Sequence, residues 1–269
     1  MARRLRLALL AVLLARTAAA GAAPMVAAWS FDEHADAPVF ADAGPRGLNL
    51  RRGAGAEVAA GGKGNALRPA AIASRGGPAG ATLSGPSLGA AVAAGDLSPG
   101  SRRWSMSAVI RIDSNATDEG VLYELAVQPP GTAALVFSIA VSPSENAFVV
   151  RCLGRSHGAA ADASAVPVAF PNPGGPPHRE AVARTLFLVM AERLARDRWF
   201  LVELDFAGGN TLALRVDGAP VAAAIVAGGL ETLPGEFPAL LALGADHAGR
   251  QPFPGLIDEL AIRTDPDER

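Results

Sequence analysis

Hydrophobic and polar residues alternate along much of this chain, and a period of two is typical of β-strands with one buried face. The clearest example is the segment 104–112, where the expected buried residues are Trp104, Met106, Ala108, Ile110 and Ile112. Similar short runs predict strands at 121–127, 134–141, 147–153, 184–190, 199–204, 211–216, 221–226, 239–243 and 256–262. Helical periodicity is scarce, and in residues 179–196 a turn or two of helix competes with a strand.

Turn-forming residues separate these strands. The chain has 30 glycines and 21 prolines among 269 residues, and Asp217-Gly218 is a strong hairpin signal. We expect positive φ angles at Gly64-Asn65 and at Asp217-Gly218, as tight turns require. Because about a dozen short strands occur without alternating helices, the sequence predicts an all-β fold, a two-sheet antiparallel β-sandwich of the jelly-roll type.

No linker divides the chain, so we expect one domain over residues 23–269. Residues 155–183 differ in composition, because they are rich in glycine and alanine and contain five prolines. A loop of this length is uncommon inside a compact domain. The segment therefore predicts an insertion that is either a rim loop near a binding face or loosely ordered.

The N-terminal segment has the pattern of a secretory signal peptide over residues 1–22. Arg3, Arg4 and Arg6 precede the apolar run Leu7–Ala15, and small residues follow it. The run is shorter than the roughly 20 residues that a membrane span needs, and no later stretch approaches that length. We expect a secreted protein, extracellular or in the periplasm or cell envelope, without a transmembrane segment in the mature chain; an uncleaved anchor is the alternative.

Charge and cysteine content exclude two classes of protein. The chain has 24 basic and 26 acidic residues, and the predicted signal peptide contains four of the arginines and no acid. This acidic balance argues against a globally basic nucleic-acid binder, so no nucleic-acid partner is expected. Cys152 is the single cysteine, so there is no internal disulfide, and its apolar neighbours predict a thiol buried in a strand.

Six short blocks resemble the laminin-G-like, concanavalin-A-like lectin/glucanase jelly-roll modules of secreted bacterial proteins. The blocks occur in that family's order and lie at 28–33, 62–67, 104–110, 198–202, 212–218 and 243–262. The resemblance implies two stacked antiparallel sheets and a non-catalytic role in binding or adhesion, often to an extracellular glycan or glycoprotein. Phe200-Leu201 replaces the His pair that is usual in the family, and Leu214 stands where Tyr is common.

The same resemblance implies a calcium ion in many members, and no other cofactor. Asp258, in the closing Asp258-Glu259 segment, is the first candidate ligand and Asp32 the second, because the first and last strands of a jelly roll are often neighbours. The alternative is that both are hydrogen-bonded turn or surface acids. The four histidines, His34, His157, His178 and His247, show no paired spacing, so a zinc site has little support.

Two patterns suggest catalysis, and neither is complete, so we expect no catalytic residues and no enzyme. Residues 154–158 match G-x-S-x-G, which would make Ser156 the nucleophile of a serine esterase, but a Pro-rich segment follows instead of a helix. Glu203 and Asp205 alternate like the first two acids of a glucanase E-x-D-x-x-E strand, but Gly208 stands at the third position. A hydrolase of either type remains the alternative, as does a purely structural envelope sandwich.

The expected ligand is a glycan or glycoprotein, bound by rim loops or the concave sheet. We predict that Trp29, Trp104 and Trp199 face the core, because each lies at a strand position that is buried in the family. Few aromatic rings would then be left to stack on sugars. The sequence therefore does not identify the ligand-binding residues.

Overall fold

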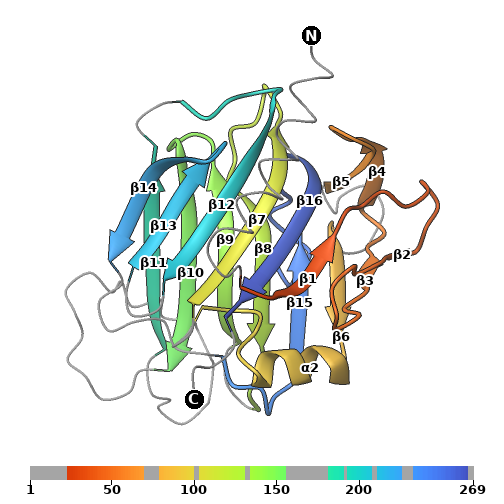
Figure 1. Ribbon diagram of the computed structural model, residues 1–269, viewed down its shortest axis with the longest axis vertical. Coiled ribbons are helices and arrows are strands. Elements are labelled where there is room, and N and C mark those ends of the chain that lie inside the picture. The colour runs from red at the N-terminus through yellow and green to blue at the C-terminus, as the bar shows by residue number, and fades with distance from the viewer. Residues whose placement is uncertain are drawn as a thin grey trace, which may run out of the picture.

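The computed structural model describes residues 23–69, 79–99, 103–130, 134–155, 181–190, 193–207, 211–225 and 233–265. They form two antiparallel sheets stacked face to face (Figure 1). The predicted all-β, two-sheet sandwich is therefore confirmed.

The front sheet has the order β14-β13-β12-β7-β16-β5-β4, and β1 also pairs with β16. Its strands are β1 (Met25–Trp29), β4 (Ala56–Ala60), β5 (Asn65–Pro69), β7 (Arg103–Ile112), β12 (Trp199–Ala207), β13 (Thr211–Val216), β14 (Ala219–Ile225) and β16 (Gly255–Thr264). Strand β16 is central, because it pairs with β7 on one side and with β1 and β5 on the other.

The back sheet has the order β11-β10-β9-β8-β15-β6-β3-β2. Its strands are β2 (Val39–Phe40), β3 (Leu50–Arg52), β6 (Ala81–Ser84), β8 (Gly120–Val127), β9 (Leu135–Ser142), β10 (Ala147–Arg155), β11 (Ala181–Val189) and β15 (Ala239–Leu243). The short helix α2 (Pro86–Ala93) follows β6 and lies at one end of the sandwich (Figure 1). No helix of the described residues is both long and apolar enough to cross a membrane.

The core lies between the sheets and follows from the alternation of β7. Its even-numbered residues from Trp104 to Ile112 are buried, as predicted. The Trp104 ring contacts two rings of the back sheet, with centroids 5.5 Å from Phe137 and 6.4 Å from Tyr123. Tyr123 donates its hydroxyl to the Leu97 carbonyl at 2.5 Å, and burial raises the pKa of this hydroxyl well above its ordinary value.

Two of the three tryptophan predictions are confirmed and one is wrong. Trp29 and Trp104 are buried, and Trp29 Nε1 donates to the Leu48 carbonyl at 2.8 Å. Trp199 is only partly buried and lies on the outer face of the front sheet, because the core-facing residues of β12 are Phe200, Val202, Leu204 and Phe206. Residues 199–202 are apolar on both faces, so their alternation alone does not decide which face is buried.

The predicted insertion at 155–183 has different limits. Arg155 is the last residue of β10, and residues 181–183 belong to β11, which is a strand rather than the alternative helix. The central part of that segment, with Ser156, His157 and His178, lies outside the described residues, as does the predicted signal peptide. Cys152 lies in β10 as predicted, but its side chain is not among those described.

The orientation of β12 has a direct test. Phe206 is fully buried, so Phe206→Ala leaves a cavity, and we expect a loss of about 3–5 kcal/mol in the free energy of unfolding. Glu203→Ala on the opposite face is the control, with an expected change within about 0.5 kcal/mol. Denaturant unfolding of both variants measures the difference. Similar losses in the two variants would contradict this orientation of the strand.

Candidate functional site

Several connections meet at one end of the sandwich, the upper end in Figure 1. Strands β7, β9, β11, β13 and β15 end there, and the strands paired with them begin there. We call this end the loop end; its connections include residues 113–119, 143–146, 193–198, 217–218 and 244–254.

Hydrogen bonds between these connections hold the loop end together. Arg196 donates to the carbonyls of Ala116 and Pro143, both at 3.2 Å. The side chain of Asn146 donates to the Met190 carbonyl at 2.9 Å and accepts from the Leu194 N–H at 2.7 Å. Connections that are distant in sequence are thus fixed relative to one another, which favours a preformed binding surface.

A cavity of about 390 Å³ lies at this end, between the 193–198 connection and the β13–β14 hairpin. Eight of its eleven lining residues are apolar; the full set is Met190, Arg193, Leu194, Ala195, Arg198, Phe200, Val216, Asp217, Ala219, Pro220 and Val221. Its volume falls within the range of roughly 300–1,000 Å³ that is common for small-molecule sites. The charged residues Arg193, Arg198 and Asp217 are the polar groups that could orient a ligand.

Asp217 organises the cavity wall. One carboxylate oxygen accepts the Leu201 N–H at 2.9 Å, and the other accepts from Arg198 Nη2 at 3.2 Å. Its φ of 51° and the φ of 80° at Gly218 confirm the predicted tight turn. The aspartate therefore fixes the turn between β13 and β14 against the start of β12.

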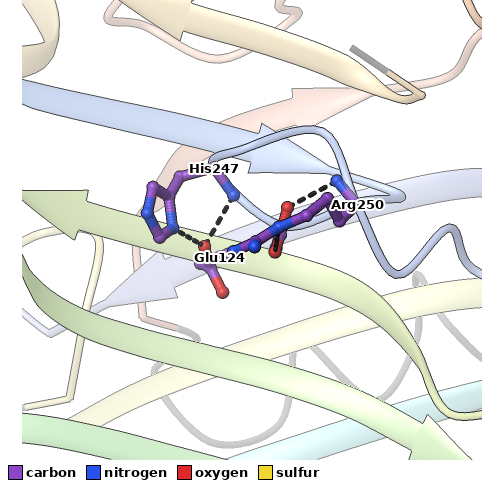
Figure 2. A network of polar contacts seen from close by, with 4 residues as sticks. Glu124, His247 and Arg250 are labelled. Atoms are coloured by element: carbon purple, nitrogen blue, oxygen red, sulfur yellow. Dashed lines mark hydrogen bonds and ion pairs between the residues drawn. The ribbon is translucent and has the colours of Figure 1, made fainter. Parts of the chain in front are cut away.

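A second polar cluster holds the 244–254 connection against the back sheet. Figure 2 shows the backbone N–H and the imidazole of His247 converging on Glu124 of β8, with Glu124 Oε1 at 2.7 Å from N and 2.6 Å from Nδ1. Asp246 accepts the Arg250 N–H at 2.5 Å and pairs with its Nε at 3.2 Å. The hydrogen bond to Glu124 raises the pKa of His247 against the lowering effect of burial. These hydrogen bonds hold residues of the 244–254 connection to one another and to strand β8.

The predicted site residues Asp258 and Asp32 both bind the glycine-rich segment 61–65, which comprises the turn between β4 and β5 and the first residue of β5. A β-bulge in β16 separates the register of Ile257 from that of Glu259, and Asp258 lies between them. Its Oδ2 accepts the N–H groups of Gly62 at 2.7 Å and Lys63 at 3.2 Å. Asp32 Oδ1 accepts the Asn65 N–H at 3.0 Å. The structure thus brings the two acids to the same segment, as hydrogen-bond acceptors.

This arrangement does not form an oxygen cage for calcium. Asp258 is only 3% exposed, and burial raises its pKa to about 6, with smaller opposing contributions from the two N–H groups and added repulsion from Glu259 and Asp32. Among the residues that the structure describes, no group of three or more His, Cys, Asp or Glu side chains is placed to hold a metal. Calcium binding by Asp258 and Asp32 therefore stays a prediction.

Glycine at position 64 allows the Asp32 carboxylate to lie close to the turn, and it is not needed for a positive φ. Gly64 and Asn65 do not have the positive φ that we expected. A Cβ at Gly64 would lie 1.8 Å from Asp32 Oδ1, so a side chain there requires the exposed aspartate to move away from the turn.

Trp199 covers the same turn from the outer face of the front sheet. A Cβ at Gly62 would lie 3.2 Å from the Trp199 ring, and the Arg111 guanidinium lies 5.9 Å from the ring centroid. The ring is therefore in contact with protein atoms on this face, which is unlike an open platform for sugar stacking.

The structure provides little support for either catalytic alternative, the Ser156 esterase or the glucanase-like pair Glu203 and Asp205. Strand β10, which leads to Ser156, pairs antiparallel with β9 and β11, whereas a nucleophile elbow belongs to a parallel α/β sheet. Glu203 and Asp205 lie on one face of β12, as expected, but Asp205 is inside the strand rather than at a turn and forms an ion pair with Arg103 at 3.7 Å. Gly208 lies outside the described residues.

Comparison with known proteins supports the fold and does not identify a family. No family model matches the chain, and no curated protein matches its sequence. Membership of the laminin-G-like family therefore stays a prediction.

Solved structures with very different sequences are similar to this chain to different degrees. The binding domain of Paraclostridial Mosquitocidal Protein 1 matches with a TM-score of 0.53 and 11% identity, over 91% of this chain and 50% of that chain. A Trypanosoma rangeli sialidase in complex with the inhibitor DANA gives 0.49 and 16%, over 91% of this chain and 32% of the sialidase. The CBM40 of a Ruminococcus gnavus IT-sialidase, bound to α2,3-sialyllactose, gives 0.42 and 12%, over 61% of this chain and 76% of the module. At these identities a match concerns the fold alone, and the first, with a TM-score above 0.5, supports the β-sandwich; this chain spans half or less of the first two proteins.

The position of Gly64 predicts a measurable effect of adding one methyl group. Gly64→Ala displaces the Asp32 carboxylate and breaks its hydrogen bond to the Asn65 N–H, so we expect a loss of about 0.5–1.5 kcal/mol in the free energy of unfolding. Gly89→Ala in α2 is the matched control, because no atom lies within 4 Å of the added Cβ. Alanine is the better helix former there, so the control should be unchanged or slightly more stable. Equal effects in thermal unfolding would count against the close contact with Asp32.

The raised pKa of Asp258 predicts a pH-dependent stability difference. Its pKa is about 6 in the folded chain, against an ordinary value of 3.8, so the folded state holds the proton more tightly than the unfolded state. The contribution of Asp258 is therefore fully present below pH 3.8 and is lost as pH rises through about 6. Asp258→Asn removes this titration, so the stability of the variant relative to the parent should increase between pH 4 and pH 6.5 and then level off.

Thermal and denaturant unfolding of the parent and Asp258→Asn across this pH range measure the effect, since all other titrating groups are common to both. A difference that does not change with pH would contradict the assignment. The same pair tests calcium, because a bound ion would raise the Tm of the parent relative to EDTA and leave the variant unchanged.

Proposed function

We propose that this chain is a secreted, non-catalytic binding module that recognises an extracellular glycan or glycoprotein through the cavity at the loop end. The observation that carries the proposal is the cavity of about 390 Å³, whose lining combines apolar residues with the charged residues Arg193, Arg198 and Asp217. Sugars have a similar character, since the C–H face of the ring is apolar and the hydroxyl groups at its edge form hydrogen bonds.

The walls of the cavity support binding because they are ordered by the protein itself. Arg196 and Asn146 fix the 193–198 connection, and Asp217 fixes the opposite hairpin. A site that is already formed loses less conformational entropy when a ligand binds. Its placement among loops fits the expected rim-loop site rather than the face of a sheet.

The chemistry of the lining supports a non-catalytic role. Asp217 is the one carboxylate among the lining residues, and both of its oxygens accept hydrogen bonds from protein donors. The described lining residues include no Ser, Thr, Cys or His, so they supply no nucleophile paired with a base.

Secretion and adhesion rest on other observations. The N-terminal pattern of arginines, an apolar run and small residues supports export, and the β-sandwich is shared with a domain described as the binding domain of a mosquitocidal protein. Proteins with this fold have many different functions, so the fold alone does not identify a binding site. The experiment below therefore substitutes residues of the cavity.

A pair of tryptophan substitutions tests the cavity. Ala219 lines it and Ala223, on the same strand, is exposed and does not line it. The parent is screened on a glycan array that includes sialylated, uronic-acid, sulfated and neutral structures, with calcium and with EDTA. We expect Ala219→Trp to fill the cavity and weaken binding to the parent's ligands by roughly tenfold or more, with Ala223→Trp unchanged.

Two outcomes oppose the proposal. A parent protein that binds no glycan or glycoprotein, with or without calcium, would remove the binding function. Equal weakening by both tryptophan variants, or by neither, would place the site away from the loop-end cavity. Thermal unfolding of each variant shows whether it remains folded.

A further inference from the structure

The charged residues that line the loop-end cavity present more positive than negative charge to a ligand. Arg193, Arg198 and Asp217 are the charged lining residues. The negative group is already occupied, because Asp217 accepts the Leu201 N–H at 2.9 Å and the Arg198 Nη2 at 3.2 Å. A ligand therefore meets two arginine side chains and one carboxylate that is already hydrogen-bonded.

Both arginines keep donors for a ligand. Arg198 uses one terminal nitrogen on Asp217, and its side chain is 63% exposed, whereas a guanidinium has five N–H donors. Arg193 is exposed and forms no ion pair with any other residue in the described part of the chain. A planar guanidinium binds carboxylate and sulfate oxygens through paired, charge-assisted hydrogen bonds, which neutral hydroxyl groups do not form with equal strength.

The apolar lining of the cavity restricts the kind of ligand molecule that can bear an anionic group bound by these arginines. Its apolar lining includes Val216, Pro220 and Val221, whose side chains are exposed or partly exposed and favour a ring or alkyl face over a second charge. A small inorganic anion would leave most of this apolar surface uncovered. The lining therefore favours a ligand with an acidic group at one edge and an apolar face beneath it.

We propose that the ligand of the loop-end cavity is an acidic glycan whose carboxylate is bound by Arg193 and Arg198 while its ring lies against the apolar side chains of the β13–β14 hairpin. This inference rests on the proposed function and narrows it to one class of saccharide. A sulfate ester presents similar oxygens to the arginines, so the experiment separates the two acids.

The test compares saccharides that differ in the acidic group. On the glycan array the matched sets are galactose and galacturonic-acid oligomers, sialylated and unsialylated lactose, and sulfated and unsulfated galactosides. We expect binding to concentrate on the carboxylated members, with at least roughly tenfold weaker binding to their neutral partners. Binding should also weaken as salt is raised from 50 to 300 mM, because the arginines are partly exposed.

Three arginine variants assign the effect to the cavity. Arg193→Gln and Arg198→Gln should each reduce binding of the preferred acidic glycan toward that of its neutral partner, as measured by calorimetry. Arg215→Gln is the control, because Arg215 is an exposed arginine of the β13–β14 hairpin beside the cavity and does not line it. Arg193 has no described ion pair to lose, so its variant should keep the parent's Tm even if Arg198→Gln unfolds more readily.

The outcomes separate this inference from the proposed function. Neutral and acidic partners bound equally, with binding still lost in Ala219→Trp, would overturn the inference and leave the binding function intact. A preference for sulfated members alone would overturn the carboxylate assignment, and an acid preference equally reduced by Arg215→Gln would overturn the role of the cavity. No binding to any glycan would remove both proposals.

Discussion

The contact between Trp104 of the front sheet and the rings of Tyr123 and Phe137 in the back sheet joins the two layers on which the rest of the structure depends. Each sheet alone would expose one apolar face, and stacking them buries both. The Trp104 indole nitrogen has no hydrogen-bond partner among the described residues, which costs free energy. The aromatic packing and the buried area of three large rings outweigh this cost.

Because the sheets are fixed relative to each other, their strand ends meet at the same place. The connection at 193–198 passes from the back sheet to the front sheet there, and Arg196 and Asn146 bind it to neighbouring connections. The loop-end cavity is thus a product of sheet stacking and strand direction, with the side chains of one connection and one hairpin completing its walls.

Much of the fold follows from the sequence, because burial of one face imposes a period of two. The strands from 104 onward were predictable in this way, as was the Asp217-Gly218 turn. Helix α2 was not, because its Ala- and Gly-rich residues show no amphipathic period. Trp199 was assigned to the wrong face, since four consecutive apolar residues begin β12 and the polar residues that decide the orientation come later.

The candidate site was less predictable. Asp258 of the closing strand and Asp32, which follows β1, lie at one region, but their partners are backbone N–H groups, which the sequence does not reveal. The cavity combines residues 190–200 with residues 216–221, and no local pattern marks either set. Such a site arises from tertiary packing between sheets, so it becomes visible only when the two layers are placed together.

The antiparallel pairing of β1 with β16 also has a mechanical consequence. Met25 lies opposite Arg263, so both strands can be pulled from the same end of their ladder, the end remote from the loop end. Tension applied between these two residues loads one rung at a time, and the ladder peels open instead of resisting in shear. Force on this strand pair therefore releases β1 stepwise from the edge of β16, beginning far from the loop-end cavity.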